Sequence, residues 1–200
     1  MNSKIKKAIS LYESKKLNKA EEICLEILKE QPNHFESLRL LSLICYLNKN
    51  FSKALEFINK AIKIDSNHAA SYNDRGGIFF QLKKIDEAVE SYDRAIKIKP
   101  NLIQVYKNRG IALLELKKLN AAIENYDELL KIKPDNAEAY LKKGNALREL
   151  KLLDSALQNY ENAIKIKPDY AAAYSNRGLV LHELKKIESA IVDYNKAIKI

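Results

Sequence analysis

The chain has 200 residues and a formal net charge of +9, from 35 Lys and Arg against 26 Asp and Glu. Its apolar content of 46% is typical of a folded protein and argues against an intrinsically disordered chain. No apolar run approaches the roughly 20 residues that a membrane span needs, and the first residues, MNSKIKKAISLYESKK, lack the continuous apolar core of a secretory signal. We therefore expect no membrane partner and a cytoplasmic location.

The positive charge comes mainly from lysines at recurring positions, in segments such as LKK and KIKP. Lysine lacks the planar fork with which arginine binds phosphates and bases. We therefore interpret these lysines as solvated helix ends, and nucleic acid is not the expected partner. The net charge still favours partners of acidic character.

The sequence repeats with a period of 34 residues. Frames of this length begin at six positions, and the last frame is four residues short: Met1, Phe35, Ala69, Ile103, Ala137 and Ala171. We call the nth position of each frame column n. Column twenty is alanine in every frame: Ala20, Ala54, Ala88, Ala122, Ala156 and Ala190.

Frames one and two, residues 1–34 and 35–68, are the least regular. At columns four, eight and twenty-four they hold Lys4 and Leu38, Ala8 and Ser42, and Cys24 and Ile58. We expect frame one to serve as a capping end. The two cysteines, Cys24 and Cys45, fall on apolar positions of predicted helices, so we expect buried, reduced thiols and no metal site.

Frames three to six share tyrosine at columns four and twenty-four and glycine at column eight. These residues are Tyr72, Tyr106, Tyr140 and Tyr174, then Tyr92, Tyr126, Tyr160 and Tyr194, and the glycines Gly76, Gly110, Gly144 and Gly178. Glycine inside a helix costs about 1 kcal/mol relative to alanine. Its recurrence beside the alanine column predicts that two helices cross closely there, with the bulky columns above and below.

Each frame contains two helical patterns. In frame three, one face of a 3.6-residue period holds Ala88, Val89, Tyr92, Ala95 and Ile96. An earlier helix carries Tyr72, Gly76 and Phe79, and the segment LKKID separates the two. Proline at column thirty-two is predicted to end the second helix, and it is present in four frames: Pro32, Pro100, Pro134 and Pro168.

These columns resemble the tetratricopeptide repeat family, whose pattern has an aromatic residue at column four, Gly at eight, Ala at twenty, an aromatic at twenty-four, Ala at twenty-seven and Pro at thirty-two. The resemblance implies an all-α fold, a right-handed α-solenoid of stacked helix-turn-helix hairpins whose stability depends on stacking. The expected single array covers residues 1–200 in about six repeats: 1–34, 35–68, 69–102, 103–136, 137–170 and the truncated 171–200.

Column seven departs from the family, which usually has leucine there. It holds Lys7, Leu41, Arg75, Arg109, Lys143 and Arg177. We expect the stems of the cationic side chains to pack and their charged heads to reach an acid on a neighbouring helix.

The resemblance implies that the first helix of each hairpin lines the concave side. We call its columns two, five, nine and twelve, with six and thirteen beside them, the first-helix strip. Asparagine amides can donate to and accept from an extended peptide backbone, and Lys or Arg can bind its carboxylates. An alternative is that the apolar members of columns nine and twelve are buried between neighbouring helices. The candidate peptide-binding residues are Arg39, Asn73, Lys107, Asn108, Lys142, Asn145 and Asn176.

Two binding sites of the family can be compared by register. The carboxylate clamp for chaperone tails needs Lys at column five with Asn at nine, but Ile111 follows Lys107 at that spacing. Column two also lacks lysine, so chaperone tails are not expected ligands. The asparagine ladder of O-linked N-acetylglucosamine transferases matches at Asn108 and Asn176, and Asp74 and Lys142 interrupt it.

No catalytic set of residues is evident. His34 and His68 occupy the same loop column of successive frames and are not expected to converge on a metal. We therefore predict no enzyme activity and no cofactor. The leading hypothesis is a non-enzymatic protein–protein interaction scaffold that binds a peptide or protein segment along the first-helix strip. Two alternatives are the recognition module of a longer enzyme such as a glycosyltransferase and, more weakly, nucleic-acid binding.

The sequence stops at Ile200, inside the last predicted helix. We expect five side chains of this helix to face outward with no further helix to cover them: Ala190, Ile191, Tyr194, Ala197 and Ile198. Such an apolar face predicts either a longer protein or self-association through the uncapped helix.

Overall fold

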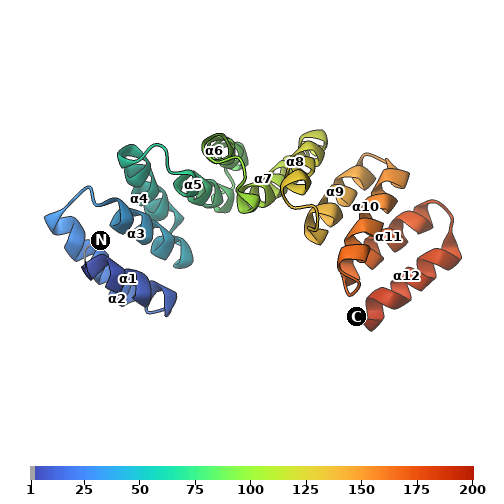
Figure 1. The fold of residues 1–200 in the computed structure, drawn as a ribbon, viewed down its shortest axis with the longest axis horizontal. Coiled ribbons are helices and arrows are strands. Elements are labelled where there is room, and N and C mark those ends of the chain that lie inside the picture. The colour runs from blue at the N-terminus through green and yellow to red at the C-terminus, as the bar shows by residue number, and fades with distance from the viewer. Residues whose placement is uncertain (1–2) are drawn as a thin grey trace. The chain divides into compact units, whose positions relative to one another are not determined.

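The computed structural model describes residues 3–200, and this part of the chain forms twelve α-helices and no β-strand (Figure 1). Each 34-residue frame supplies one pair of helices, as predicted, and the odd-numbered helix is the first of its pair. The bounds are α1 Ser3–Glu13, α2 Leu17–Glu30, α3 Phe35–Leu47, α4 Phe51–Ile64, α5 Ala69–Gln81, α6 Ile85–Ile98, α7 Ile103–Glu115, α8 Leu119–Ile132, α9 Ala137–Glu149, α10 Leu153–Ile166, α11 Ala171–Glu183 and α12 Ile187–Lys199.

The helices belong to two compact units, Met1–Pro100 (unit 1) and Asn101–Ile200 (unit 2). In unit 1, α1 packs on α2, α3 on α4 and α5 on α6, and successive hairpins contact through α2 with α3 and α4 with α5. Unit 2 follows the same scheme, with contacts of α8 with α9 and α10 with α11 between its hairpins. First helices also contact one another, α3 with both α1 and α5, and α9 with α11. The first helices of each unit therefore lie in a row.

A lysine in the left-handed backbone region lies in the turn of every hairpin. The six residues have φ between 55° and 62°: Lys15, Lys49, Lys83, Lys117, Lys151 and Lys185. After α5, the amide of Lys83 donates to the carbonyl of Phe80 at 3.1 Å and that of Lys84 to the carbonyl of Phe79 at 2.9 Å. This is the Schellman pattern of helix ends, which normally favours glycine because a Cβ is crowded there.

The second helices end where the sequence predicts, although proline is not required. Helix α6 ends at Ile98, and Lys99 is extended before Pro100, as steric contact with a following proline favours. Helix α4 ends at the same column, at Ile64, although Ser66 stands in place of the proline.

His34 and His68 cap the N-termini of α3 and α5. The Nδ1 atom of each accepts a hydrogen bond from a backbone amide, that of Ser37 or Ser71, at 3.2 Å. Asn136 caps α9, because its Oδ1 atom accepts a hydrogen bond from the backbone amide of Ala139 at 3.1 Å. Because a cap supplies an acceptor to an otherwise unpaired amide of the first turn, the shared column of the two histidines has a structural explanation.

Within the later hairpins, the column-eight glycine lies against the ring of the column-twenty-four tyrosine. A Cβ added to Gly144 would come within 2.6 Å of Cε1 of Tyr160, and one on Gly178 within 2.8 Å of Cε1 of Tyr194. The neighbouring column-twenty alanine, Ala156, is fully buried. The predicted close approach of the two helices is confirmed, but the tyrosine ring lies at the contact rather than above or below it.

The first two hairpins fill the same space with smaller residues. Cys24 and Ile58 replace the tyrosine, and column eight then carries a side chain, Ala8 or Ser42. The hydroxyl of Ser42 donates to the carbonyl of Ala54 at 2.9 Å, which confirms that columns eight and twenty face each other. The space at column eight therefore varies with the size of the residue at column twenty-four.

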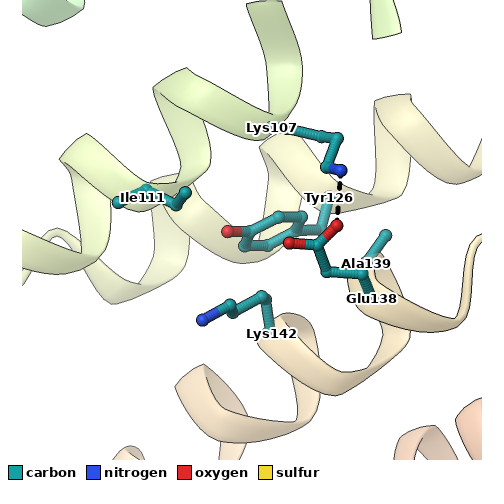
Figure 2. Close-up of a pocket in the computed structure, with 6 residues that line it drawn as sticks. All are labelled: Lys107, Ile111, Tyr126, Glu138, Ala139 and Lys142. Atoms are coloured by element: carbon teal, nitrogen blue, oxygen red, sulfur yellow. Dashed lines mark ion pairs between the residues drawn. The ribbon is translucent and has the colours of Figure 1, made fainter. Parts of the chain in front are cut away.

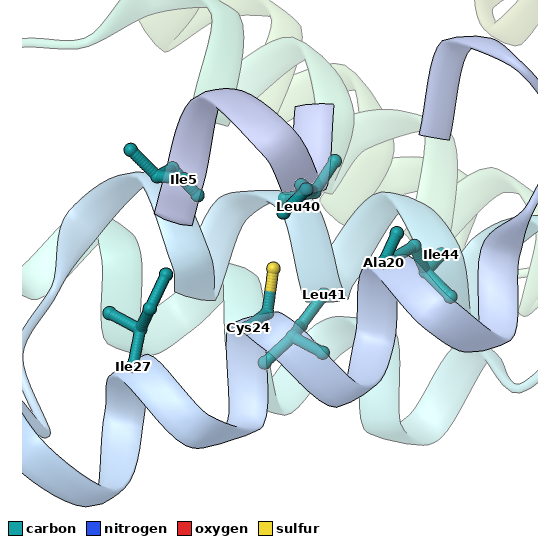
Figure 3. Close-up of a cluster of buried hydrophobic side chains, with 8 residues drawn as sticks. Ile5, Ala20, Cys24, Ile27, Leu40, Leu41 and Ile44 are labelled. Atoms are coloured by element: carbon teal, nitrogen blue, oxygen red, sulfur yellow. The ribbon is translucent and has the colours of Figure 1, made fainter. Parts of the chain in front are cut away.

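Both cysteines are buried free thiols, as expected. Cys24 lies in the core of the first hairpins (Figure 3), together with Ile5, Ala8, Ala20, Ile27, Leu40, Leu41 and Ile44. Burial raises the pKa of the Cys24 thiol to about 11. The thiol is therefore protonated at neutral pH and packs as a small apolar group.

The expectation for the last helix is correct only in part. Ile191 and Ile198 of α12 are 51% and 82% exposed, as predicted. The prediction was wrong for Ala190, which is buried, because column twenty faces the partner helix within the hairpin. Tyr194 is half-buried over Gly178 for the same reason. Self-association through α12 stays a prediction.

We predict that Gly144→Ser destabilises unit 2 by about 1–3 kcal/mol, the usual cost of overpacking, because the new Cβ meets the ring of Tyr160. Adding Tyr160→Ile recreates the Ser42 and Ile58 pair of the second hairpin and should recover much of that loss. Chemical denaturation of the four proteins of this double-mutant cycle gives the coupling energy. Additive effects of the two substitutions would contradict the contact.

We also predict that Lys49→Gly raises the free energy of unfolding by about 1 kcal/mol, because glycine relieves the crowding of a left-handed residue. Lys60→Gly within α4 is the matched control and should instead lower it by about 1 kcal/mol. Thermal denaturation compares the two variants with the parent. A lower melting temperature for Lys49→Gly would mean that the turn is not strained.

Candidate functional site

The seven candidate residues all lie on first helices and are all half-buried. Unit 1 holds two of them, Arg39 on α3 and Asn73 on α5. Unit 2 holds the other five: Lys107 and Asn108 on α7, Lys142 and Asn145 on α9, and Asn176 on α11.

In unit 1, the charge of Arg39 is matched within the chain. Its Nε atom donates to Oδ2 of Asp74 on α5 at 3.3 Å. Burial raises the pKa of the Asp74 carboxyl, and the nearby Arg39 opposes that rise. Arg39 therefore links α3 to α5, and an acidic ligand would have to compete with Asp74 for it.

In unit 2, Lys107 is engaged in the same way. Its ammonium lies 2.5 Å from Oε2 of Glu138 (Figure 2), so the pair joins α7 to α9. Asn108 accepts a hydrogen bond from Nε2 of Gln104 at 2.9 Å. Glu138, at column two, thus forms an ion pair with Lys107, at column five of the preceding hairpin.

Asn145 and Asn176 form part of one polar network. The Oδ1 atom of Asn145 accepts from the hydroxyl of Tyr160 at 2.9 Å and from Nδ2 of Asn176 at 2.8 Å. These bonds connect α9 with α10 and with α11. Hydrogen bonds to neighbouring helices therefore hold the amide groups of this part of the first-helix strip in place.

A small pocket lies between α7, α8 and α9. It encloses about 10 Å³ and is lined by Lys107, Ile111, Tyr126, Glu138, Ala139 and Lys142 (Figure 2). Lys107 and Lys142, two of the candidate residues, both line this pocket. The sequence interpretation missed Tyr126, which was assigned to the core. The signal that could have found it is column nine, where Ile111 stands in place of the asparagine that bonds Tyr160.

The column-seven cations follow the prediction in part. Arg177 binds the buried Asp193 through two hydrogen bonds of 2.7 Å, and Lys143 binds Asp127 at 2.5 Å. The expectation of an acid was wrong for Arg75, whose Nε donates to the hydroxyl of Ser91 at 3.1 Å. A guanidinium can be satisfied by a neutral acceptor when enough of it stays in water.

Residues 3–200 contain neither a cluster of metal ligands nor a helix that could span a membrane. No group of three or more His, Cys, Asp or Glu in this range is placed to hold a metal ion. No helix of the same range is long and apolar enough to cross a membrane.

Comparison with family models gives three matches. A model described as a TPR repeat matches residues 76–117, 110–151 and 144–185, at intervals of one frame. A model of the tetratricopeptide repeat matches residues 171–200. Residues 13–95 match a model described as anaphase-promoting complex, cyclosome, subunit 3. No curated protein sequence matches the chain significantly.

Several solved structures share the fold. PilF of Pseudomonas aeruginosa superposes with a TM-score of 0.79 at 19% identity, over 96% of this chain and 87% of PilF. YrrB, a TPR protein with an unusual peptide-binding site, has a TM-score of 0.76 at 21% identity, over 90% and 92% of the two chains. MamA has a TM-score of 0.74 at 23% identity, over 78% and 91%. At these identities the likeness concerns the fold.

We predict that Arg177→Met destabilises the last hairpin by about 3 kcal/mol, the cost of leaving a buried charge unpaired, because Asp193 is only 3% exposed. Adding Asp193→Leu should recover most of that loss. Arg75→Met, whose partner is the neutral Ser91, is the control and should cost less. Hydrogen exchange of the α11 and α12 amides measures the effect locally. Equal losses for both arginines would contradict a buried ion pair.

Proposed function

Because this chain belongs to the tetratricopeptide repeat family, we propose that it is a non-enzymatic interaction scaffold. In this proposal a peptide or protein segment binds along the first-helix strip. A cytoplasmic location belongs to the same proposal.

The observation that carries the proposal is the set of polar side chains on the first helices of unit 2. Lys107, Asn108, Lys142, Asn145 and Asn176 are half-buried, so each keeps part of its surface open to a ligand. Their neighbours already hold several of them in place, through Glu138, Gln104 and Tyr160. Groups ordered before binding lose less entropy when a ligand arrives.

The chain's own acids indicate what kind of ligand fits. Glu138 and Asp74 place carboxylates beside Lys107 and Arg39 on the strip. A ligand carboxylate would find the same cations by the same chemistry. Lys142 forms no ion pair with any carboxylate in residues 3–200, which favours a partner with an acidic residue near α9.

The alternatives have less support. Two turn lysines of unit 2 pair with acids of the next hairpin, Lys117 with Glu149 at 3.0 Å and Lys151 with Glu183 at 2.9 Å. These pairs lower the positive potential beside the two lysines, which nucleic-acid binding would need. A glycosyltransferase module is not favoured by the matches reported above, and Lys142 still interrupts the asparagine column.

We predict that Asn108→Ala combined with Lys142→Ala weakens binding of the natural partner roughly thirtyfold, since each lost hydrogen bond contributes about 1 kcal/mol. Affinity capture from the native extract, followed by measurement of the dissociation constant of the captured partner, tests this. The fold should be unchanged by circular dichroism.

The matched control is Asn120→Ala with Lys131→Ala. It removes the same two residue types from exposed positions of the second helix α8. Its affinity should equal that of the parent protein. Equal weakening by both double variants, or by neither, would contradict binding along the first-helix strip.

A further inference from the structure

One hydroxyl group lies buried without a partner at the base of the unit 2 pocket. The side chain of Tyr126 is 2% exposed. Its hydroxyl has no hydrogen-bond partner among the residues that the structure describes. Burying a donor without an acceptor is unfavourable. A bound ligand with an acceptor atom would remove this cost.

The corresponding tyrosine of the next hairpin shows what is missing. The hydroxyl of Tyr160 donates to Asn145, which stands at column nine. The residue at column nine beside Tyr126 is Ile111, which has no acceptor. Each ring lies on the column-eight glycine of its hairpin, but Cζ and the hydroxyl of Tyr126 lie nearest to Gly110, whereas Cε1 and Cδ1 of Tyr160 lie nearest to Gly144. The hairpin with asparagine at column nine therefore satisfies its tyrosine hydroxyl, and the hairpin with isoleucine there does not.

The pocket is large enough for one small group. Its volume of about 10 Å³ is close to what a single water molecule needs, so one oxygen atom fits beside the hydroxyl. The outer wall is formed by Ile111, which is 40% exposed, and by the half-buried Lys142. Rearrangement of these two partly exposed side chains can open the pocket to solvent.

The surrounding charges select the chemistry of that group. Figure 2 shows the Tyr126 hydroxyl directed toward the side of the pocket where Ile111 and the Lys142 ammonium lie. Glu138 also lines the pocket, but Lys107 matches its charge. Burial, and secondarily Glu138, raises the pKa of Tyr126, so the phenol remains a donor at neutral pH. A neutral donor beside an uncommitted cation favours an anionic acceptor.

We propose that Tyr126 and Lys142 together bind one carboxylate group. One of its oxygens accepts from the Tyr126 hydroxyl inside the pocket, and the other faces the Lys142 ammonium. Assigning that carboxylate to a bound peptide rests on the proposed function, as an Asp or Glu side chain or as a C-terminus. The anion site itself does not depend on that assignment.

Small carboxylates test the site directly. The probes are acetate, N-acetylglutamic acid α-amide for a side-chain carboxylate and N-acetylalanine for a C-terminal one, with acetamide as the neutral probe, all at constant ionic strength. NMR of the full chain should show saturable shifts of the Tyr126 and Lys142 amides with the three carboxylates and none with acetamide. The carboxylate that binds more tightly identifies the source. Equal effects of acetate and acetamide would overturn the proposal.

Three variants make the test specific. Tyr126→Phe keeps the ring that packs on Gly110 and should weaken carboxylate binding at least fivefold. Tyr92→Phe, at the same column in unit 1, should leave it unchanged. Ile111→Asn supplies the acceptor that Asn145 gives Tyr160, so it should abolish binding without lowering the melting temperature. Unchanged binding in Tyr126→Phe or in Ile111→Asn would overturn the assignment.

The outcome is separable from that of the proposed function, because the probes involve no natural partner. Failure of the carboxylates to bind, with partner capture still sensitive to Lys142, would remove only the carboxylate site. Binding of the carboxylates in a protein that captures no partner would leave the site in place and remove only the scaffold.

Discussion

The contact between a glycine of the first helix and a tyrosine ring of the second determines how each later hairpin is built. With no side chain at Gly144, the ring of Tyr160 lies directly on the backbone of α9. Where the second helix carries Cys24 or Ile58, the first helix can carry Ala8 or Ser42. The two helices of a hairpin thus use one face each for this contact, and a different face of the first helix remains for the polar residues of the first-helix strip.

Most of the fold could be predicted because the same residue types recur at the same columns of successive frames. A glycine and an alanine at the same spacing in successive frames imply a helix crossing, whatever their neighbours. The geometry of the turns could not be predicted, because a lysine such as Lys83 has no intrinsic preference for the left-handed region that it occupies. In the folded chain, the backbone hydrogen bonds that close the helix end stabilise this conformation. Likewise, Ser66 gave no sign that α4 ends at the same column as its proline-bearing counterparts.

The positions of the candidate site residues could be predicted, but their partners could not. Arg39 with Asp74, Lys107 with Glu138 and Asn145 with Asn176 are pairs between hairpins, more than thirty residues apart in sequence. A periodic pattern shows that such residues share a surface, and it does not show which side chains reach each other. The sequence did not identify Tyr126 as a pocket residue for a related reason. Its ring is buried as the repeat pattern predicts. Its hydroxyl differs because it has no hydrogen-bond partner in the pocket that it shares with Ile111.

The ion pairs between successive turns of unit 2 have a consequence for how such a chain can grow. Lys117 reaches Glu149, and Lys151, two residues beyond that acid, reaches Glu183. The frame at residues 137–170 therefore carries both a lysine that pairs with the next frame and a glutamate that pairs with the preceding one. A tandem duplication of this frame would therefore add one lysine and one glutamate that can form the same pairs. The longer chain would need no compensating substitutions at these turns.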